Sequence, residues 1–508
     1  MKDKNQYSDS RDNEYEKVPA EDLSSEVKNV PQKVGNSWLQ YVATASVCLF
    51  AMAAGGTGSW TSPALPHLKS NNSEIPITDV EGAWIAALME VGIFTGNIVF
   101  LFIYSFLGRK NWILMISIPY IIAWLMIVFA KNIITLYISR FITGVSGDLA
   151  MMLVPIYIGE IADKDIRGIL LIGIRIFINL GHMYAKTAGA LFSYKTMNIM
   201  ILIIPILFFT IFFFMPESPY YLLLQNQREK ALKTLMMLKG VKIPEIVDSD
   251  LKRIDKSVKE NQENRKWKFR QLFAVKGNRK SLFIALVAWT TKHLSGSTSI
   301  GAFTQDIFKE TEIPLAPEIC ALIIAIIGVI MALVATLIIE RAGRKRTFLL
   351  SGLFSALGLA IVGIFFFMKT FLKLNVKSIT WLPLLGLIVY EIAFSLGISY
   401  IPFILMGEIF SLNVKMPAVL FINTTMSMVL ITVKLTFSWV NNLAGTYTSF
   451  WIYAICTFFG SILYFCIAPE TKGKTLEEIQ ENMHTRKKKK VPLDKLLKQY
   501  FRIKCCRK

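Results

Sequence analysis

The stretch PIYIGEIADKDIRG, residues 155–168, follows an apolar segment and returns in altered form as PFILMGEIFSLNVKM at 402–416. Each copy opens with proline and carries a glycine-glutamate pair, which ends at Glu160 in one copy and Glu408 in the other. A basic residue follows seven positions after each glutamate. Because both copies end a long apolar segment in the same way, they predict that the chain contains two equivalent halves.

Two further motifs repeat in the same order. FLGRK (106–110) returns as RAGRK (341–345), and PESP (216–219) returns as PETKG (469–473). Each motif lies at the polar end of an apolar segment. Three repeated pairs in one order, with the copies in corresponding places, indicate an internal duplication of the kind found in many secondary transporters.

Composition places these halves in a membrane. The chain has 508 residues, of which 53% are hydrophobic and 18% charged, and its mean hydropathy is +0.47. Twelve apolar segments approach the roughly 20 residues that a spanning helix needs. They centre on Val47, Phe94, Tyr120, Met151, Leu180, Ile206, Thr291, Ile327, Gly358, Phe394, Leu430 and Thr457. We expect an all-α membrane protein of twelve helices in two pseudo-symmetric halves.

The same count sets the expected domain boundaries. They are an N-terminal tail 1–40, a six-helix half 41–215, a helical loop 216–280, a second six-helix half 281–468 and a basic C-terminal tail 469–508. In the loop, Ala231, Leu235 and Leu238 are spaced for one face of an amphipathic helix. We therefore expect a small helical cap there rather than a catalytic domain.

The basic residues orient the chain. Its net charge is +20, and Lys and Arg gather in LGRKN (107–111), ADKDIRG (162–168) and ERAGRKR (340–346), all on one predicted side. Because cytoplasmic loops are rich in Lys and Arg, both termini and the central loop are expected to be cytoplasmic. The sequon at Asn71 falls in the first loop on the other side, where a glycan is expected. No apolar region near residue 1 indicates a cleaved signal peptide.

Acids as well as bases recur at the cytoplasmic ends of both halves. They are Arg109, Glu160, Arg167 and Glu217 in the first half and Arg344, Glu408, Lys415 and Glu470 in the second. Partly buried ion pairs that bridge the halves and break when the halves move apart would bias a two-state equilibrium. We expect these residues to form a cytoplasmic gate.

Together these motifs resemble one known family. The motifs above, with SRFITG (139–144), WTSPAL (60–65) and WLPL (381–384), are similar to those of the sugar porter family of the major facilitator superfamily, and within it to the insect facilitated trehalose transporter-like branch. The resemblance covers the chain from the first helix to about residue 479. It implies a plasma-membrane carrier that moves a hexose or a disaccharide such as trehalose by alternating access. It implies a sugar and the bilayer as partners, no nucleic acid and no cofactor; the oligomeric state stays open.

The resemblance also assigns substrate-binding residues, several of which depart from the family pattern. The seventh helix of sugar porters typically reads Gln-Gln-x-Ser-Gly-x-Asn, and its amides bind sugar hydroxyls; the matching residues here include Lys292, His293 and Thr298. On its own, a lysine near the middle of the apolar stretch 281–303 costs about 2.5–3.5 kcal/mol to insert. Both lines of reasoning place Lys292 and His293 at a central aqueous cavity.

Three other positions join the expected site by the same resemblance. Asn179 stands where the fifth helix of the family carries a ligand amide, Phe403 replaces a tryptophan of the tenth helix, and Ser427 falls in the Asn-Trp position of the eleventh. The matching position in the eighth helix is Gly328. The site has therefore lost amides and an indole and has gained positive charge.

Three interpretations of this pocket stay open at this point. Lys292 donates to the oxygens of a neutral sugar, or the substrate is an anionic sugar derivative, or the chain is a degenerate carrier that acts as a sensor. Proton-linked sugar porters resemble one another in an aspartate of the first helix, and AAGGTGSW (53–60) has no acid. We expect facilitative uniport, with proton symport as the alternative.

The remaining ionisable residues inside apolar segments are expected to be structural partners. They are Glu90, Asp148, Arg175, His182, Lys186, Glu391 and Lys434. The four histidines, at 67, 182, 293 and 484, do not approach metal-ligand spacing, and no nucleophile-base grouping falls on one side. We expect neither a metal site nor an enzyme.

Overall fold

The computed structural model describes residues 37–71, 73–103, 108–263, 269–471 and 478. Across these ranges the regular secondary structure is helical, and no strand occurs in them. The tails expected at 1–40 and 469–508 lie almost wholly outside the described residues. The expected all-α fold is confirmed.

The first half contains six long helices and one short one. They are α2 (Trp38–Ser59), α3 (Thr61–Leu68), α4 (Asp79–Ile103), α5 (Arg109–Val128), α6 (Ile133–Ile161), α7 (Lys164–Leu191) and α8 (Tyr194–Phe213). Side-chain caps fix two of the starts, because Asn132 accepts a hydrogen bond from the Thr135 amide and Ser193 from the Thr196 amide. Asn71, the expected glycosylation site, lies exposed in the turn after α3.

The central loop folds into four helices, and the first three of them share a small core. They are α9 (Pro219–Leu224), α10 (Arg228–Lys239), α11 (Glu245–Glu263) and α12 (Phe269–Ala274). The face predicted for α10 is the buried one, since Ala231, Leu235 and Leu238 are all shielded from solvent. Helix α10 is anchored to the first half because Gln40 of α2 donates to the Leu238 carbonyl.

The second half repeats the plan with two interrupted helices. Its elements are α13 (Lys276–Leu294), α14 (Ser297–Thr311), α15 (Pro317–Ala342), α16 (Arg344–Phe366), the π-helical η1 (Phe367–Phe371), the 3-10 helix η2 (Lys377–Ile379), α17 (Leu382–Leu396), α18 (Ile401–Glu408), α19 (Leu412–Ala444) and α20 (Thr446–Ile467). It starts at Lys276, five residues before the expected boundary at 281, because α13 includes a polar first turn.

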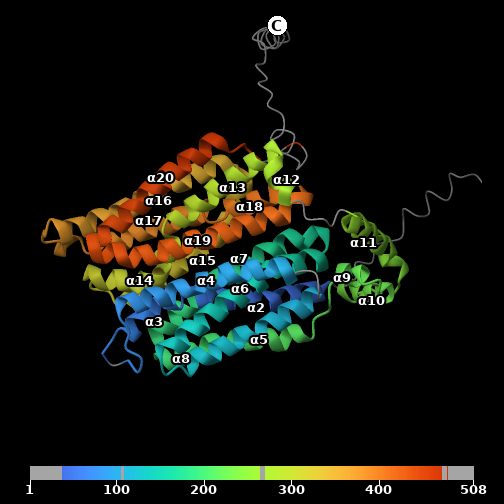
Figure 1. Ribbon diagram of the computed structural model, residues 1–508, viewed down its shortest axis with the longest axis horizontal. Helices are drawn as coiled ribbons and strands as arrows, with labels where there is room; N and C mark the ends of the chain where they lie inside the picture. Colours follow the sequence, from blue (N-terminus) through green and yellow to red (C-terminus); the bar gives the residue numbers. More distant parts are fainter. Residues whose placement is uncertain (1–36, 72, 104–107, 264–268, 472–477, 479–508) are drawn as a thin grey trace, which may run out of the picture.

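Figure 1 shows the halves lying side by side, with α2–α8 below and α13–α20 above. The loop helices α9, α10 and α11 gather at one end of the bundle, which we call the loop end. Helix α3 lies at the opposite end, which we call the α3 end. The halves meet where α4 packs on α19 and α7 on α15.

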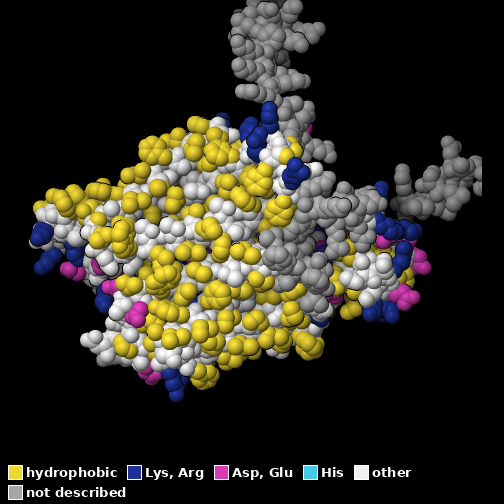
Figure 2. All heavy atoms as spheres, in the orientation of Figure 1, with side chains coloured by type: hydrophobic (Ala, Val, Ile, Leu, Met, Phe, Trp, Pro, Cys, Tyr) yellow, Lys and Arg dark blue, Asp and Glu magenta, His cyan; other side chains and the backbone are white. Residues whose placement is uncertain are grey.

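The bundle surface suits a bilayer. Figure 2 shows hydrophobic side chains over its visible face, with Lys, Arg, Asp and Glu gathered toward the two ends. By length and composition, eleven stretches in the described part of the chain can cross a membrane. They contain eleven of the twelve expected centres, and the twelfth, Thr291, lies in the interrupted pair α13–α14.

Small residues allow close helix contacts within the first half. A Cβ added at Gly55 of α2 would lie 2.1 Å from the Ile178 carbonyl oxygen of α7, and one at Gly181 of α7 would lie 2.0 Å from the Met52 carbonyl oxygen of α2. Such approaches are the usual basis of helix packing in membranes, where no hydrophobic difference between lipid and protein drives association. They position α7, which carries Arg175 and Asn179, against the first helix of its own half.

Candidate functional site

Two broken helices meet in the second half. Helix α13 ends at Leu294 and α14 begins at Ser297, and between them Gly296 has φ +75°. A Cβ at Gly296 would lie 2.2 Å from the ring of Tyr453, so both backbone conformation and space require glycine. A second break, at residues 397–400, separates α17 from α18. The two broken helices contact each other, because the Ser295 hydroxyl lies 3.2 Å from the Tyr390 hydroxyl of α17.

Lys292 occupies the last turn of α13, just before this break. Its side chain is only 8% exposed. The ammonium nitrogen lies 4.6 Å from the ring centroid of Trp289 and 4.1 Å from that of Phe403. Among the ion pairs between described residues none involves Lys292.

The two rings do not fully compensate this buried charge. A desolvated cation–π contact is worth about 2 kcal/mol, whereas taking an ion out of water costs several kcal/mol. Rings also supply no oxygen acceptor for the three N–H donors of an ammonium. The carbonyls at the end of α13 help through the helix dipole, which favours cations at a C-terminus.

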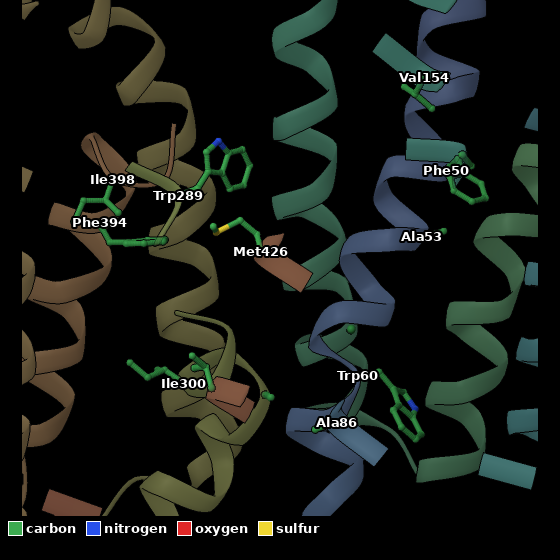
Figure 3. Close-up of a cluster of buried hydrophobic side chains, with 14 of the residues drawn as sticks. Phe50, Ala53, Trp60, Ala86, Val154, Trp289, Ile300, Phe394, Ile398 and Met426 are labelled. Carbon is green, nitrogen blue, oxygen red and sulfur yellow. The ribbon is translucent and has the colours of Figure 1, made fainter. Parts of the chain in front are cut away.

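His293 and Phe403 complete the cluster around Trp289. His293 is 5% exposed, its ring centroid lies 5.6 Å from that of Trp289, and its Nδ1 has no hydrogen-bond partner in the described structure. The ring of Phe403 lies 4.6 Å from that of Trp289 and is 48% exposed. In Figure 3 the indole of Trp289 extends from α13 toward the first half, close to Met426.

Arg175 brings a cation from the first half to the same cluster. From α7 its guanidinium lies 5.3 Å from the ring centroid of Tyr400 and 5.8 Å from that of Phe403. It donates a hydrogen bond to the Ser399 hydroxyl, and its Nε has no described partner. Arg175 was expected from the sequence to be only a structural partner. The signal that could have singled it out is an arginine inside an apolar segment with no acid at helical spacing.

Asn179 and Ser427 make their described hydrogen bonds outside this cluster. Asn179 donates to the Gly328 carbonyl on α15 at 3.4 Å, so these two positions meet across the halves. Ser427 accepts from the Asn97 side chain at 3.4 Å, which also joins the halves. Thr298 lies on α14 past the break, and its hydroxyl has no hydrogen-bond partner in the described structure.

A buried ion pair also links the halves. The Lys434 ammonium of α19 lies 2.6 Å from a Glu90 carboxylate oxygen of α4 and 3.2 Å from the Ala86 carbonyl oxygen. Both side chains are almost fully shielded. The expectation that Glu90 and Lys434 are structural partners is met by this contact.

The expected gate residues pair within their own halves. Arg109 binds Glu160 at 3.1 Å in the first half, and Arg344 binds Glu408 at 3.1 Å in the second. These two pairs do not bridge the halves, which corrects the expectation for them in this state. The sequence motifs predict which charged residues lie at this end of the bundle. Which ion pairs they form depends on the distance between the halves.

Two further acids of the set cap helices. Glu217 accepts from the Lys110 amide at 3.0 Å and the Asn111 amide at 3.4 Å, at the start of α5. Glu470 accepts from the Arg344 amide at 3.0 Å and the Lys345 amide at 3.2 Å, at the start of α16. A carboxylate at a helix N-terminus satisfies free amides and the dipole together.

Arg167 and Lys415, the remaining members, have no carboxylate partner in the described structure. Arg167 donates to the Ala162 carbonyl at 3.0 Å, and its Nε is unpaired there. Lys415 lies half-buried at the start of α19, at the same end of the bundle.

At the α3 end the halves are joined by charge. The Lys69 ammonium lies 2.8 Å from Asp79 of its own half and 3.0 Å from Asp306 of α14 in the other half. Burial alone would lower the pKa of Lys69, but the Asp306 and Asp79 carboxylates outweigh it and raise that pKa above its ordinary value. Lys69 therefore keeps its charge at neutral pH.

Comparison with known proteins now decides the family. Residues 50–483 match the family described as "Sugar (and other) transporter". The chain belongs to this family.

The chain is 30% identical over 447 residues to a facilitated trehalose transporter, Tret1, of Aedes aegypti and 30% identical over 445 residues to the one of Culex quinquefasciatus. These alignments cover 88% and 87% of the chain, 55% of the Aedes relative and 86% of the Culex relative. The chain thus spans about half the length of some curated relatives.

Solved structures confirm the fold. The inward-open xylose transporter XylE from E. coli superposes with a TM-score of 0.72 at 19% identity, covering 87% of this chain and 99% of that one. Its partially occluded inward-open form gives a TM-score of 0.71 at 18% identity. The major facilitator fold expected from the sequence is therefore confirmed.

Proposed function

We propose that this protein carries a sugar across the membrane by alternating access, as a facilitative transporter. The observation that carries the proposal is the cluster around Trp289, at which Lys292 of the second half and Arg175 of the first both contact Phe403. A buried polar cluster between two duplicated halves, beside interrupted helices, is the usual place for a carrier's substrate. Family membership and trehalose-transporting relatives support a sugar, a hexose or a disaccharide, as the substrate.

We assign the described state to a carrier closed at the α3 end. Lys69–Asp306 joins the halves there, and Glu90–Lys434 joins them between α4 and α19. At the loop end, Arg109–Glu160 and Arg344–Glu408 are each contained in one half. Bridging of the halves by the eight gate residues stays a prediction for the state closed at the loop end.

We further propose a plasma-membrane location with the loop end and both termini in the cytoplasm. The basic motifs at the loop end support this orientation. Exposed Asn71 at the α3 end would then be available for glycosylation from outside.

Uptake into liposomes that contain the purified protein tests the function. Trehalose, glucose and fructose should enter saturably, and sugar preloaded inside should accelerate uptake of labelled sugar. Uptake that never saturates and shows no counterflow would point to a pore. Absence of uptake for every sugar, neutral or acidic, would overturn the transport proposal.

Energy coupling is tested in the same preparation. An imposed proton gradient should leave the uptake of a neutral sugar unchanged if the protein is a uniporter. Proton symport stays the alternative, because one carboxylate oxygen of Glu90 and one of Asp148 inside the bundle have no hydrogen-bond partner among the described residues. Strong dependence of accumulation on the gradient would establish symport instead.

A further inference from the structure

We propose that the site around Trp289 selects a sugar that bears an anionic group, a carboxylate or a phosphate, over the neutral sugar. This inference rests on the proposed transport of sugars and names the substrate class of the same site.

The site holds two cations on one aromatic ring. The Lys292 nitrogen is 4.1 Å and the Arg175 guanidinium carbon 5.8 Å from the ring centroid of Phe403. They therefore stand no more than the sum of those distances, 9.9 Å, apart. They come from different halves, so an anion between them would contact both halves at once.

Both cations have unused donors. The ammonium of Lys292 makes no described hydrogen bond or ion pair, and the Nε of Arg175 has no described partner. The side chain of Lys292 is more than nine-tenths buried. A further group of the same cluster, Nδ1 of His293, also lacks a partner in the described structure. These donors call for a ligand rich in acceptors.

The neighbouring acids do not cancel this positive charge. Glu391 on α17 acts electrostatically on Arg175 and Lys186, and its carboxylate accepts a hydrogen bond from the Ser395 hydroxyl, but it makes no ion pair with a cation in the described structure. Glu90 is already bound by Lys434. Arg175 and Lys186 thus share one acid, Glu391, and Lys292 has no acid partner in the described structure.

An anion fits these donors better than a neutral sugar does. Sugar hydroxyls present donors as well as acceptors, whereas a carboxylate or phosphate presents acceptors only and makes stronger, charge-assisted bonds to Lys and Arg. The exposed face of Phe403 offers a platform for the apolar face of the sugar ring. The family's amides would give no such preference.

The test compares glucose with gluconate, glucuronate and glucose 6-phosphate in liposomes that contain the full chain. We expect the acids to be taken up with at least tenfold higher kcat/KM than glucose. Comparing the two carboxylates with the phosphate ester shows which of the two anionic groups the site prefers. We expect Lys292→Gln to reduce that preference about tenfold, the effect of one lost charge-assisted bond. Lys292→Arg should retain it. Lys195→Gln, which removes an exposed charge on α8, is the matched control and should leave it unchanged.

Ligand-dependent melting temperature in detergent provides a readout without transport. An acid should raise it more than glucose does in the wild-type chain and in Lys195→Gln, and the difference should vanish in Lys292→Gln. If glucose and trehalose show saturable counterflow while the acids neither bind nor enter, the anion inference is overturned and the transport proposal stands. If no sugar binds or enters, both are overturned.

Discussion

Lys292 is held between the rings of Trp289 and Phe403, and no described carboxylate is in ion-pair distance of its ammonium. Rings offset part of the cost of burying a charge but provide no oxygen acceptor. What enters the site must therefore supply the missing interactions, and a substrate that cannot do so is penalised.

Replacing Lys292 and His293 by amides should favour neutral sugars. In the double variant Lys292→Gln and His293→Gln, two amides replace the buried ammonium and the imidazole, as in the family pattern. We expect several-fold faster uptake of glucose or trehalose, since a neutral sugar no longer has to compensate a buried charge. Uptake rates at equal amounts of reconstituted protein measure this. Abolished uptake of a neutral sugar would show instead that the two side chains contribute positively to its binding.

Part of this candidate site could be predicted from the sequence. Lys292 and His293 were identifiable because a charge in the middle of an apolar stretch is costly, and Phe403 because its motif aligns with the family. Arg175 was not, because only the three-dimensional packing of α7 against residues 399–403 shows that it reaches the other half. Ser427 and Asn179 contact Asn97 and Gly328 of the opposite halves, and their expected role in binding substrate stays a prediction.

Among the elements, the interrupted pair α13–α14 determines the position of Lys292, which lies in the last turn of α13 before the break. Gly296 has φ +75° and faces the ring of Tyr453. A side chain at positive φ costs about 1–3 kcal/mol where the structure forces that conformation, and here it also collides with the ring. The break is thus a feature that only glycine allows.

Gly296→Ala should therefore lower both stability and transport. We expect an apparent melting temperature several degrees below that of the wild type, and slower uptake because the end of α13 is displaced. Gly301→Ala is the matched control on α14, since a Cβ there meets nothing within 4 Å. Equal melting temperatures for the two variants would contradict this account of the break.

The caps at the loop end allow a second test at this scale. Glu217 binds amides at the start of α5, and Glu470 does the same for α16. We expect Glu217→Ala and Glu470→Ala each to destabilise their half by about 1 kcal/mol, the typical value of a helix cap. Glu74→Ala, an exposed acid outside the helices, serves as control. If both variants melt at the wild-type temperature, the capping role is wrong.

The sequence located the elements better than their interruptions. Long apolar segments predict spanning helices because their length must match the bilayer. The breaks at 295–296 and 397–400 depend on tertiary contacts such as Ser295 with Tyr390, which no local pattern contains. The capping roles of Glu217 and Glu470 were missed for the same reason, since each binds a helix far away in the sequence.

For the whole molecule, the distribution of contacts between the halves defines the state. Lys69 is bound to both Asp79 and Asp306 at the α3 end, and its raised pKa keeps it charged. Since the folded pKa lies above the ordinary value of 10.5, the stabilisation by this pair is fully present below that pH and is lost only as the pH rises through the folded value.

Removing this contact should shift the conformational equilibrium. In Lys69→Ala we expect a larger population open at the α3 end, because Asp306 loses its partner in the other half. Spin labels at Glu74→Cys and Leu315→Cys, exposed positions of the two halves near that end, should show a longer mean distance by pulsed electron resonance. Lys69→Arg is the control that keeps the charge. An unchanged distance distribution in Lys69→Ala would mean that this pair does not hold the halves together.

The most direct test of the central claim is the accessibility of position 292. With the six native cysteines replaced, Lys292→Cys in oriented membranes is exposed to a membrane-impermeant maleimide from one face and then from the other. Alternating access predicts labelling from both faces, at rates that fall when a transported sugar is bound. Labelling by a lipid-soluble reagent alone, with none from either aqueous face, would contradict it.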